Sequence, residues 1–307
     1  MDYALQVVGN YDHVLEIARI CERRGAAAVS LADHYLYGNR EERYVDPVYD
    51  SYVQAAALGR ETSDIEIVML VSPVTFRHPA FYAKSAITID ELSGGRFVLG
   101  LGTGWHDDEH GYFGIPYPDR NERFHMLEDA LGYVYQFFTG PAAGFESDRY
   151  SFKGLAYQPT ARSDMRILVG GGGPKRTPTL AGRFGGEYSI AGAEPDGIAE
   201  KLEVMRAAAE SAGRDPDEIL ITISSVVVSG NSDAEITDNL ARMDGTGRSG
   251  SEVRASWEER GLVFRTWEEH KDRFGRFADA GVERVYVQLV ARVAEMAEDA
   301  LDNLSGA

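Results

Sequence analysis

Short apolar segments alternate with amphipathic segments along almost the whole chain, and this alternation constrains the fold more than any other feature. Each apolar segment has the length of a strand buried on both faces, and most precede a run of helical periodicity. Strands are predicted at 4–8, 26–32, 65–71, 97–101, 166–169, 187–191, 219–228 and 285–289. Helices are predicted at 12–24, within 47–60, and at 79–92, 120–138, 177–184 and 196–212. Eight such alternations predict a parallel (β/α)8 TIM barrel rather than an open sheet.

Two segments do not fit the repeating unit. They lie near residues 139–165 and 230–265, and the second contains three glycines within six residues. We expect both to be insertions near the mouth of the barrel, the second being mobile or ordered only with ligand. No internal repeat or linker divides the sequence, so we expect one domain over residues 1–307.

Charge and cysteine content limit what the chain binds and where it works. The formal net charge is −18, which argues against nucleic acid and anionic membranes as partners. No run approaches the roughly 18 apolar residues of a membrane span, and the first residues lack the order of a signal peptide. Cys21 is the only cysteine, so no disulfide forms within the chain, which fits the cytoplasm. We expect Cys21 to be buried in helix packing.

The fourth predicted strand leads into the segment with the most chemistry. It ends at Gly102, Thr103 and Gly104, where residues without Cβ let the backbone approach a flat or phosphorylated ligand. Trp105 and the run HDDEH at 106–110 follow directly. A loop this rich in glycine, imidazole and carboxylate is typical of a ligand-binding loop.

This segment and several others resemble the luciferase-like monooxygenase superfamily, in particular its bacterial branch of oxidoreductases that use coenzyme F420, a deazaflavin. The resemblance covers RFVLGLGTGWHDDEHGYFGIPYPDRNERFHMLEDAL from residue 96, and also residues 25–35, 71–97, 166–188 and 277–289. Its order and spacing extend over nearly the whole chain. It implies a TIM barrel, F420 or alternatively FMN as cofactor, a small organic substrate, and a homodimer formed through barrel helices.

Asp33 and His34 follow the second strand, at the end of the barrel where active sites lie. An imidazole there can exchange a proton near neutral pH, and the adjacent carboxylate can fix its tautomer. A histidine that merely ties down a loop is the plainer interpretation. The resemblance implies instead that His34 faces the cofactor ring and is catalytic, with Asp33 supporting it.

Ser72, Pro73, Val74 and Thr75 leave the third strand. The resemblance implies a cis peptide bond before a residue other than proline, forming a bulge behind the cofactor ring. The sequence departs from that pattern at Pro73, so we expect the cis bond at Ser72–Pro73 or at Pro73–Val74. From the residues alone, the segment is an ordinary strand exit.

The glycine run after the fifth strand is the best candidate phosphate site. Gly171, Gly172 and Gly173 expose backbone N–H groups, and Lys175, Arg176 and Thr177 lead into a helix. Thr177 is a good N-cap and Pro178 suits the first turn, so free amides and the helix dipole would face an anion. A glycine run alone is a weak signal, and the resemblance strengthens it.

The run at 106–110 allows a competing interpretation, because His106, Glu109 and His110 fit the H-x-x-E-H pattern of zinc hydrolases. That pattern requires a helix that presents both imidazoles on one face, whereas the flanking glycines favour a loop. We therefore expect no metal, with Trp105 near the cofactor ring. Asp108 and Glu109 would contact substrate or face water.

The preferred function is hydride exchange between F420 and an organic substrate. In the alternative, FMN reduced by a separate reductase supports oxygen insertion, and a non-catalytic relative is a further possibility. The polyglutamate tail of F420 needs a basic exit, for which Arg40, Arg43 and Arg77 are candidates.

Overall fold

The chain folds into a closed parallel barrel. The computed structural model describes residues 1–36, 48–154, 159–244 and 246–305. The barrel strands of this part are β1 (Asp2–Val7), β2 (Ala28–Leu31), β3 (Glu66–Met69), β5 (Phe97–Gly102), β8 (Ile167–Gly170), β9 (Glu187–Ala191), β10 (Leu220–Val227) and β11 (Arg284–Leu289). They pair in the order β3-β2-β1-β11-β10-β9-β8-β5, and a pairing of β3 with β5 closes the ring. The predicted TIM barrel is confirmed.

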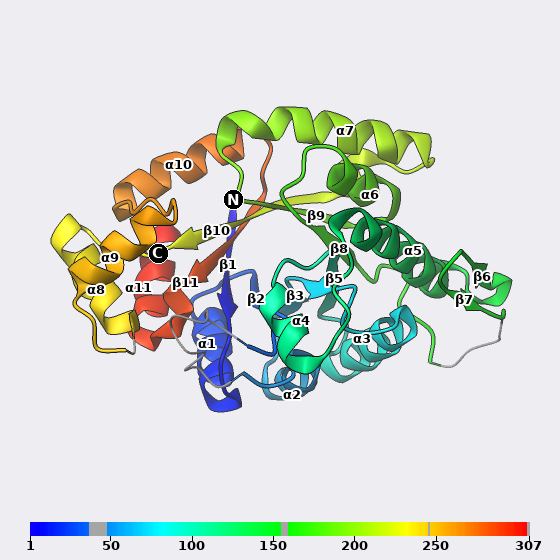
Figure 1. The fold of residues 1–307 in the computed structure, drawn as a ribbon, viewed down its shortest axis with the longest axis horizontal. Helices are drawn as coiled ribbons and strands as arrows, with labels where there is room; N and C mark the ends of the chain where they lie inside the picture. The colour runs from blue at the N-terminus through cyan, green and yellow to red at the C-terminus, as the bar shows by residue number, and fades with distance from the viewer. Residues whose placement is uncertain (37–47, 155–158, 245, 306–307) are drawn as a thin grey trace.

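Helices surround this barrel (Figure 1). They are α1 (Tyr11–Arg23), α2 (Ser51–Glu61), α3 (Pro79–Ser93), α5 (Arg120–Thr139), α6 (Arg176–Phe184), α7 (Ile198–Ser211), α10 (Trp267–Asp279) and α11 (Ala294–Ser305). The last two were not predicted. Most of α10 is charged, and only Trp267, His270, Phe274 and Phe277 of it are buried. These four residues have helical spacing, and Thr266 with Glu269 forms a capping box, so the sequence did offer signals of this helix.

Local signals place the helix ends. Asn10 and Asp50 cap α1 and α2 by accepting hydrogen bonds from backbone N–H groups of the first turns. At the end of α3, Gly94 takes the left-handed conformation with φ of 71°, which glycine adopts without steric cost. A left-handed glycine therefore ends α3.

The core has two layers, as expected for a barrel. Inside the barrel lie Ala4, Ala28, Val68, Leu70, Val98, Leu168 and Tyr286. Alternate residues of the same strands, such as Leu5 and Leu99, point outward and pack against the helices. Cys21 is fully buried in this outer layer, as expected, and burial raises the pKa of its thiol to about 12.

The two insertions lie on opposite sides of the barrel in Figure 1. The first contains η1 (Pro141–Ala143) and an antiparallel hairpin of β6 (Phe145–Glu146) and β7 (Ser151–Phe152). The second forms α8 (Asp233–Asp244) and α9 (Gly250–Glu259). Apolar residues of these two helices form a small core of their own around Trp257.

A network of buried charge fills the amino end of the barrel. Glu66 accepts hydrogen bonds from Arg166 and Arg284, each at 2.7 Å, and Glu187 accepts one from the hydroxyl of Tyr286 at 2.8 Å. Burial raises the pKa of the Glu187 carboxyl, although the two guanidinium groups act to lower it. These groups lie at the starts of β3, β8, β9 and β11.

The helices found in the described residues include none with the length and apolar character needed to cross a membrane.

Candidate active site

His34 lies just beyond β2, at the carboxyl end of the barrel. Its side chain is 12% exposed, and its Nδ1 atom lies 2.8 Å from Oε2 of Glu109. The rings of Trp105 and His106 meet it edge to face, with centroids 5.5 and 5.9 Å away. The structure therefore groups an imidazole, a carboxylate and an indole where barrel active sites are found.

Asp33 does not hold the imidazole, and our expectation that it fixes the tautomer of His34 was wrong. Its carboxylate is buried and accepts hydrogen bonds from Ser51 Oγ at 2.7 Å and from Arg77 Nη1 at 2.5 Å. Successive side chains at the end of a strand point to opposite sides, which separates Asp33 from His34. Asp33 instead joins the end of β2 to the start of α2.

The guanidinium of Arg77 is held by hydrogen bonds to groups of the protein itself. Besides Asp33, it donates to Asp50 at 2.8 Å, and its guanidinium lies 4.7 Å from the ring centroid of Tyr52. Although burial alone would lower the pKa of Arg77, the charge of Asp33 raises it above its usual value. Arg77 is therefore unsuited to hold an anionic tail, while Arg40 and Arg43 lie outside the described residues.

The run at 106–110 is helical, which corrects the loop that we expected. The short helix α4 (Asp107–Phe113) begins after His106, whose Nδ1 accepts from the N–H of Glu109, and ends at Gly114 in the left-handed conformation. Gly111, one of the flanking glycines that we took as evidence against a helix, lies inside α4. The spacing of His106 and Glu109 is that of an N-cap and the third helical residue, a signal the sequence did offer.

Glu109 does not face water, and its carboxylate contacts groups of the protein itself. Its carboxylate is fully buried, and besides His34 it accepts hydrogen bonds from the backbone N–H of Leu36, at 2.9 Å, and of Tyr35. Burial alone would raise the pKa of the Glu109 carboxyl, but the hydrogen bond and charge of His34 and the two amides lower it. Glu109 therefore takes the place that we had assigned to Asp33.

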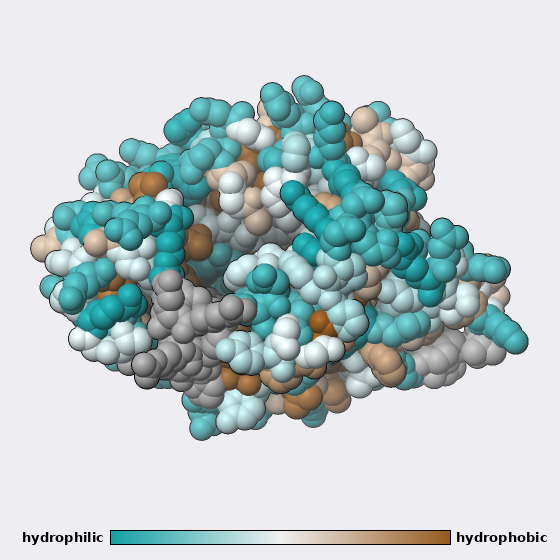
Figure 2. Space-filling view, viewed as in Figure 1, coloured by the Kyte–Doolittle hydropathy of each residue, from teal (hydrophilic) through white to brown (hydrophobic). Residues whose placement is uncertain are grey.

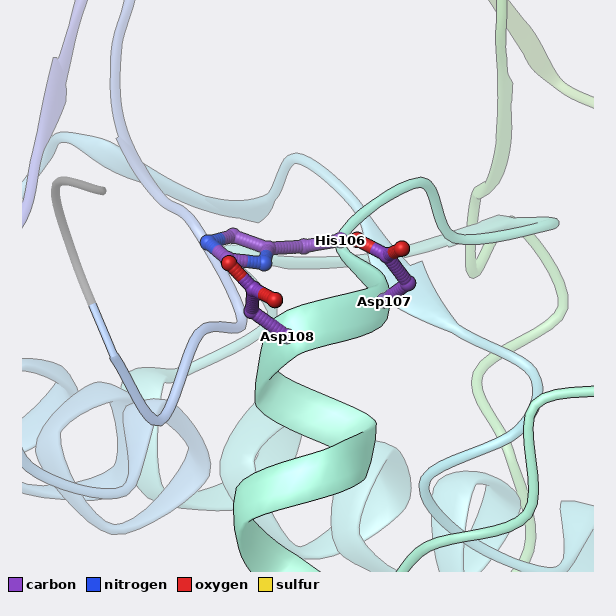
Figure 3. A group of neighbouring side chains, drawn as sticks. All are labelled: His106, Asp107 and Asp108. Atoms are coloured by element: carbon purple, nitrogen blue, oxygen red, sulfur yellow. The ribbon is translucent and has the colours of Figure 1, made fainter. Parts of the chain in front are cut away.

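The zinc interpretation has no support in this geometry. His110 uses both ring nitrogens for hydrogen bonds, at 2.7 Å each, to Thr75 Oγ1 and to the carbonyl of His106. His106, Asp107 and Asp108 do gather possible ligand atoms within 4.8 Å of one another. In Figure 3, however, the Asp108 carboxylate lies beside the His106 ring and Asp107 extends to the other side. Exposed acidic groups are commonly arranged in this way without an ion.

A cis peptide bond precedes a residue other than proline, but it joins Leu70 to Val71. We had expected it at Ser72–Pro73 or Pro73–Val74, and that position was wrong. Ser72, Pro73 and Val74 are buried: the Ser72 hydroxyl bonds to that of Tyr52 at 2.8 Å, and the Pro73 carbonyl accepts from Tyr82. They support the site from behind.

Val71 is half-buried where β5 and β8 end. A Cβ atom built on Gly102 or Gly170 would come within 2.7 Å of its side chain, and one on Gly100 within 3.1 Å. Real Cβ atoms are essentially never found as close as 2.7 Å to a neighbour. The side chain of Val71 therefore fills the space that Gly102 and Gly170 leave, and gives this part of the mouth a smooth floor. At Gly100 the nearest atom is instead the carbonyl oxygen of Met69, 1.8 Å from the Cβ position.

The glycine run after β8 leads into α6 as predicted, but Thr177 is not its N-cap. The cap position is Lys175, and no side chain caps the helix. Thr177 is 2% exposed, lies in the first turn, and directs its hydroxyl toward Gly171 and Gly173. Among the described residues this hydroxyl has no hydrogen-bond partner. An unpartnered hydroxyl on such a residue, beside uncapped amides, is suited to bind an anion.

Four cations surround this helix start. Lys201 donates to the carbonyl of Gly172 at 2.9 Å, and Arg176 donates to Asn121 while lying over the ring of Phe124. Arg120 reaches toward Gly173, and Lys175 is exposed. None of the four forms an ion pair with a carboxylate in the described part of the chain. In a protein of net charge −18, such a group of cations is conspicuous.

The surface near these groups is recessed. Figure 2 shows this face of the molecule hollowed near its centre, between the regions of α4 and α7. Trp105 is 71% exposed, and Gly104 before it has a φ of 75°. A separate cavity of about 380 Å³ lies at the opposite, amino end of the barrel, beside Met1, Lys271 and Leu304.

A parallel barrel that gathers a histidine and carboxylate pair and an uncapped helix start at its carboxyl end has the layout of a barrel enzyme. Comparison with known protein families shows which family of barrel enzymes the chain matches. Residues 2–303 match the luciferase-like monooxygenases, so the chain belongs to this family.

Individual relatives are more distant. The F420-dependent glucose-6-phosphate dehydrogenase of Nakamurella multipartita is 30% identical over 223 residues, which cover 72% of this chain and 64% of the relative. The enzyme of the same name from Mycolicibacterium gilvum is 29% identical over 211 residues, or 67% of this chain and 61% of the relative. The chain thus spans about three fifths of the length of these relatives.

Solved structures confirm the fold. An F420-dependent secondary alcohol dehydrogenase in complex with an F420-acetone adduct superposes with a TM-score of 0.78 at 17% identity, over 99% of this chain and 98% of that one. The monooxygenase RslO1 from Streptomyces bottropensis gives a TM-score of 0.77 at 19% identity, over 100% and 98% of the chains.

Proposed function

We propose that the protein is an oxidoreductase that exchanges a hydride between coenzyme F420 and a small organic substrate. The pairing of His34 with Glu109 at the mouth of the barrel carries this proposal, because it provides a proton-transfer group next to a site suited to an anionic cofactor. The names of the relatives above support F420 over other hydride carriers.

The residues present fit such a cofactor. Gly171, Gly172 and Gly173, with Lys175, Arg176 and Thr177, would hold its phosphate through backbone N–H groups, the Thr177 hydroxyl and two positive charges. A Cβ atom on Gly172 would lie 2.6 Å from the carbonyl oxygen of Ala191, so the backbone there needs glycine.

The ring would lie on the floor formed by Val71 and Gly102. Thr103, Gly104 and Trp105 would border its edge, with the buried Ser72, Pro73 and Val74 behind and Thr75 beside them. Bound there, the deazaflavin supplies a carbon that gives or takes the hydride. The protein orients the substrate and excludes water, and His34 gives or takes the accompanying proton. We assign Asp33 a positioning role through Arg77, and Asp108 a weak contact with substrate.

The four cations around Gly172 favour F420 over FMN. F420 continues beyond its phosphate into a chain of glutamates, whereas the phosphate of FMN is terminal. Arg120 and Lys175 provide charge beyond what one phosphate needs, and no described carboxylate neutralises them. This group replaces Arg77 as the candidate basic exit.

Equilibrium titration with F420 and with FMN tests the proposal. We expect submicromolar to micromolar binding of F420, and Lys175→Glu should weaken it about 5-fold. Lys271→Glu is the matched control, because it makes the same charge change beside the cavity at the amino end. Exclusive binding of FMN would contradict the F420 assignment and favour a monooxygenase supplied by a separate reductase.

We also propose a homodimer and a cytoplasmic protein built as one domain. Val53 on α2 and Phe81 on α3 are 70% and 66% exposed, and these two helices are neighbours. An apolar face of this kind is suited to pack against a second copy. Light scattering of the unaltered protein and of a Val53→Glu, Phe81→Glu variant measures the mass directly.

A further inference from the structure

Glu109 is the only carboxylate of the 106–110 run that the described structure buries completely, and the proposed reaction does not use it directly. Both its oxygens are engaged: Oε2 faces Nδ1 of His34, while Oε1 accepts from the backbone N–H groups of Tyr35 and Leu36. It therefore joins α4 to residues 34–36, in the segment that follows β2.

We infer that Glu109 is a positioning residue that holds His34 as the tautomer protonated at Nδ1, so that proton exchange with substrate takes place at Nε2. This inference deepens the proposed function and rests on it for the role of His34. It assigns to Glu109 a task that sequence reasoning gave to Asp33.

The argument follows from the acceptor character of the carboxylate. An ionised carboxylate can only accept hydrogen bonds, so the hydrogen between Oε2 and Nδ1 belongs to the imidazole. The amides of Tyr35 and Leu36 keep the carboxylate ionised and prevent it from turning away. In the neutral ring, Nε2 then carries the lone pair and can accept a proton from substrate. After that transfer the charged ring lies against the Glu109 carboxylate.

Replacement by glutamine makes this inference testable. In Glu109→Gln, the amide oxygen is still needed by the N–H groups of Tyr35 and Leu36, so the NH2 group faces His34. An NH2 group donates, which requires a lone pair on Nδ1 and moves the ring hydrogen to Nε2. The substitution preserves shape and reverses the tautomer, which a merely structural role of Glu109 would not predict.

The experiment is long-range 15N–1H NMR of protein in which the histidines are labelled with 15N. The chain has seven histidines. His34 is assigned by comparison with His34→Asn, and spectra are recorded without cofactor at about pH 9, above the ordinary pKa of imidazole. We expect His34 to be protonated at Nδ1 in the unaltered protein and in the control Asp107→Asn, which changes an exposed carboxylate on the same helix. In Glu109→Gln we expect protonation at Nε2.

Kinetics give the second measurement. Glu109→Gln should lower kcat about 100-fold while the Kd for cofactor changes less than about 2-fold, because general acid and base catalysis contributes 10²- to 10⁴-fold. An Nε2-protonated His34 in the unaltered protein would overturn the inference, as would a Glu109→Gln variant with unchanged tautomer and kcat. If the Glu109→Gln variant fails to fold, the spectrum of the unaltered protein still shows which nitrogen of His34 is protonated, and so tests the inference. If neither cofactor binds, the proposed function fails while the tautomer result stands.

Discussion

The two ends of the barrel each bury carboxylates and arginines, yet they use them differently. At the amino end, Glu66 lies between Arg166 and Arg284, and Glu187 bonds to Tyr286, so the charges mainly face one another. At the carboxyl end, Asp33 and Arg77 likewise form a closed pair, but Glu109 is directed at the imidazole of His34. The amino end closes the barrel, and the carboxyl end presents a group that can react.

The comparison shows that burial of charge does not identify an active site by itself. Both clusters shift the pKa values of their members, and both contain fully buried carboxylates. They differ in whether one member is an imidazole near the solvent, since only that group can exchange a proton near neutral pH. Substitutions at the two ends should therefore separate stability from activity.

His34 should show the largest effect on activity. We expect His34→Gln to lower kcat about 10²- to 10⁴-fold, because it removes the group that exchanges the proton. The Kd for cofactor and the midpoint of urea unfolding should change little. The measurement is turnover with any substrate that the unaltered protein accepts. A variant with near-normal kcat would show that the mouth is not the reactive end.

At the amino end, Arg284→Met should lower the free energy of unfolding by about 3–5 kcal/mol, because it leaves the buried Glu187 and Glu66 with one guanidinium fewer. The kcat of the folded protein should stay unchanged. Urea unfolding and turnover at low temperature measure the two quantities. A loss of kcat without a loss of stability would contradict the division of roles.

Gly102→Ala tests the smooth floor of the mouth. The new methyl group would meet the side chain of Val71, and overpacking of this kind costs about 1–3 kcal/mol. We expect weaker cofactor binding, and the double variant Gly102→Ala, Val71→Ala should recover part of it. Titration of the single and double variants provides the check. If the second change does not help, the two side chains are not in contact.

His270 on α10 is a buried ionisable group. Unlike the buried carboxylates at the two ends of the barrel, it has no hydrogen-bond partner on either ring nitrogen among the described residues. Burial, with Arg273 and Arg265, lowers the pKa of His270 to about 4.

The unfolded chain therefore binds a proton at His270 between about pH 6.5 and 4 that the folded protein does not, and stability falls as the pH falls through this range. This group alone should remove about 1.4 kcal/mol between neutral pH and pH 5.5. His270→Phe should abolish that part of the pH dependence, as urea unfolding at both pH values can measure. Equal pH dependence in both proteins would show that folding does not change the pKa of His270.

Much of the fold could be predicted from the sequence because the barrel depends on local patterns. Strands such as β5 are unbroken apolar runs, and Gly94 marks a helix end. α10 was missed, although its capping box of Thr266 with Glu269 and the helical spacing of Phe274 and Phe277 are local signals. α8 in the second insertion was not predicted, although Ile236, Leu240 and Met243 have helical spacing.

The site could be predicted at the level of segments but not of contacts. The positions of His34 and of the glycine run followed from where parallel strands end. The pairing of His34 with Glu109 joins residues 75 positions apart, and nothing in the sequence sets that distance. In the same way, Thr177 was expected to cap α6, but the helix begins one residue earlier than the sequence suggests.

The small core around Trp257 has a consequence for how the protein can change over generations. Val228, Ile236, Leu240, Met243 and Val253 pack there with Met296, apart from the residues that hold the barrel together. Mutations in α8 and α9 can accumulate there while the barrel still folds. Changes in this part of the molecule therefore need not disturb the packing of the barrel or the pairing of His34 with Glu109.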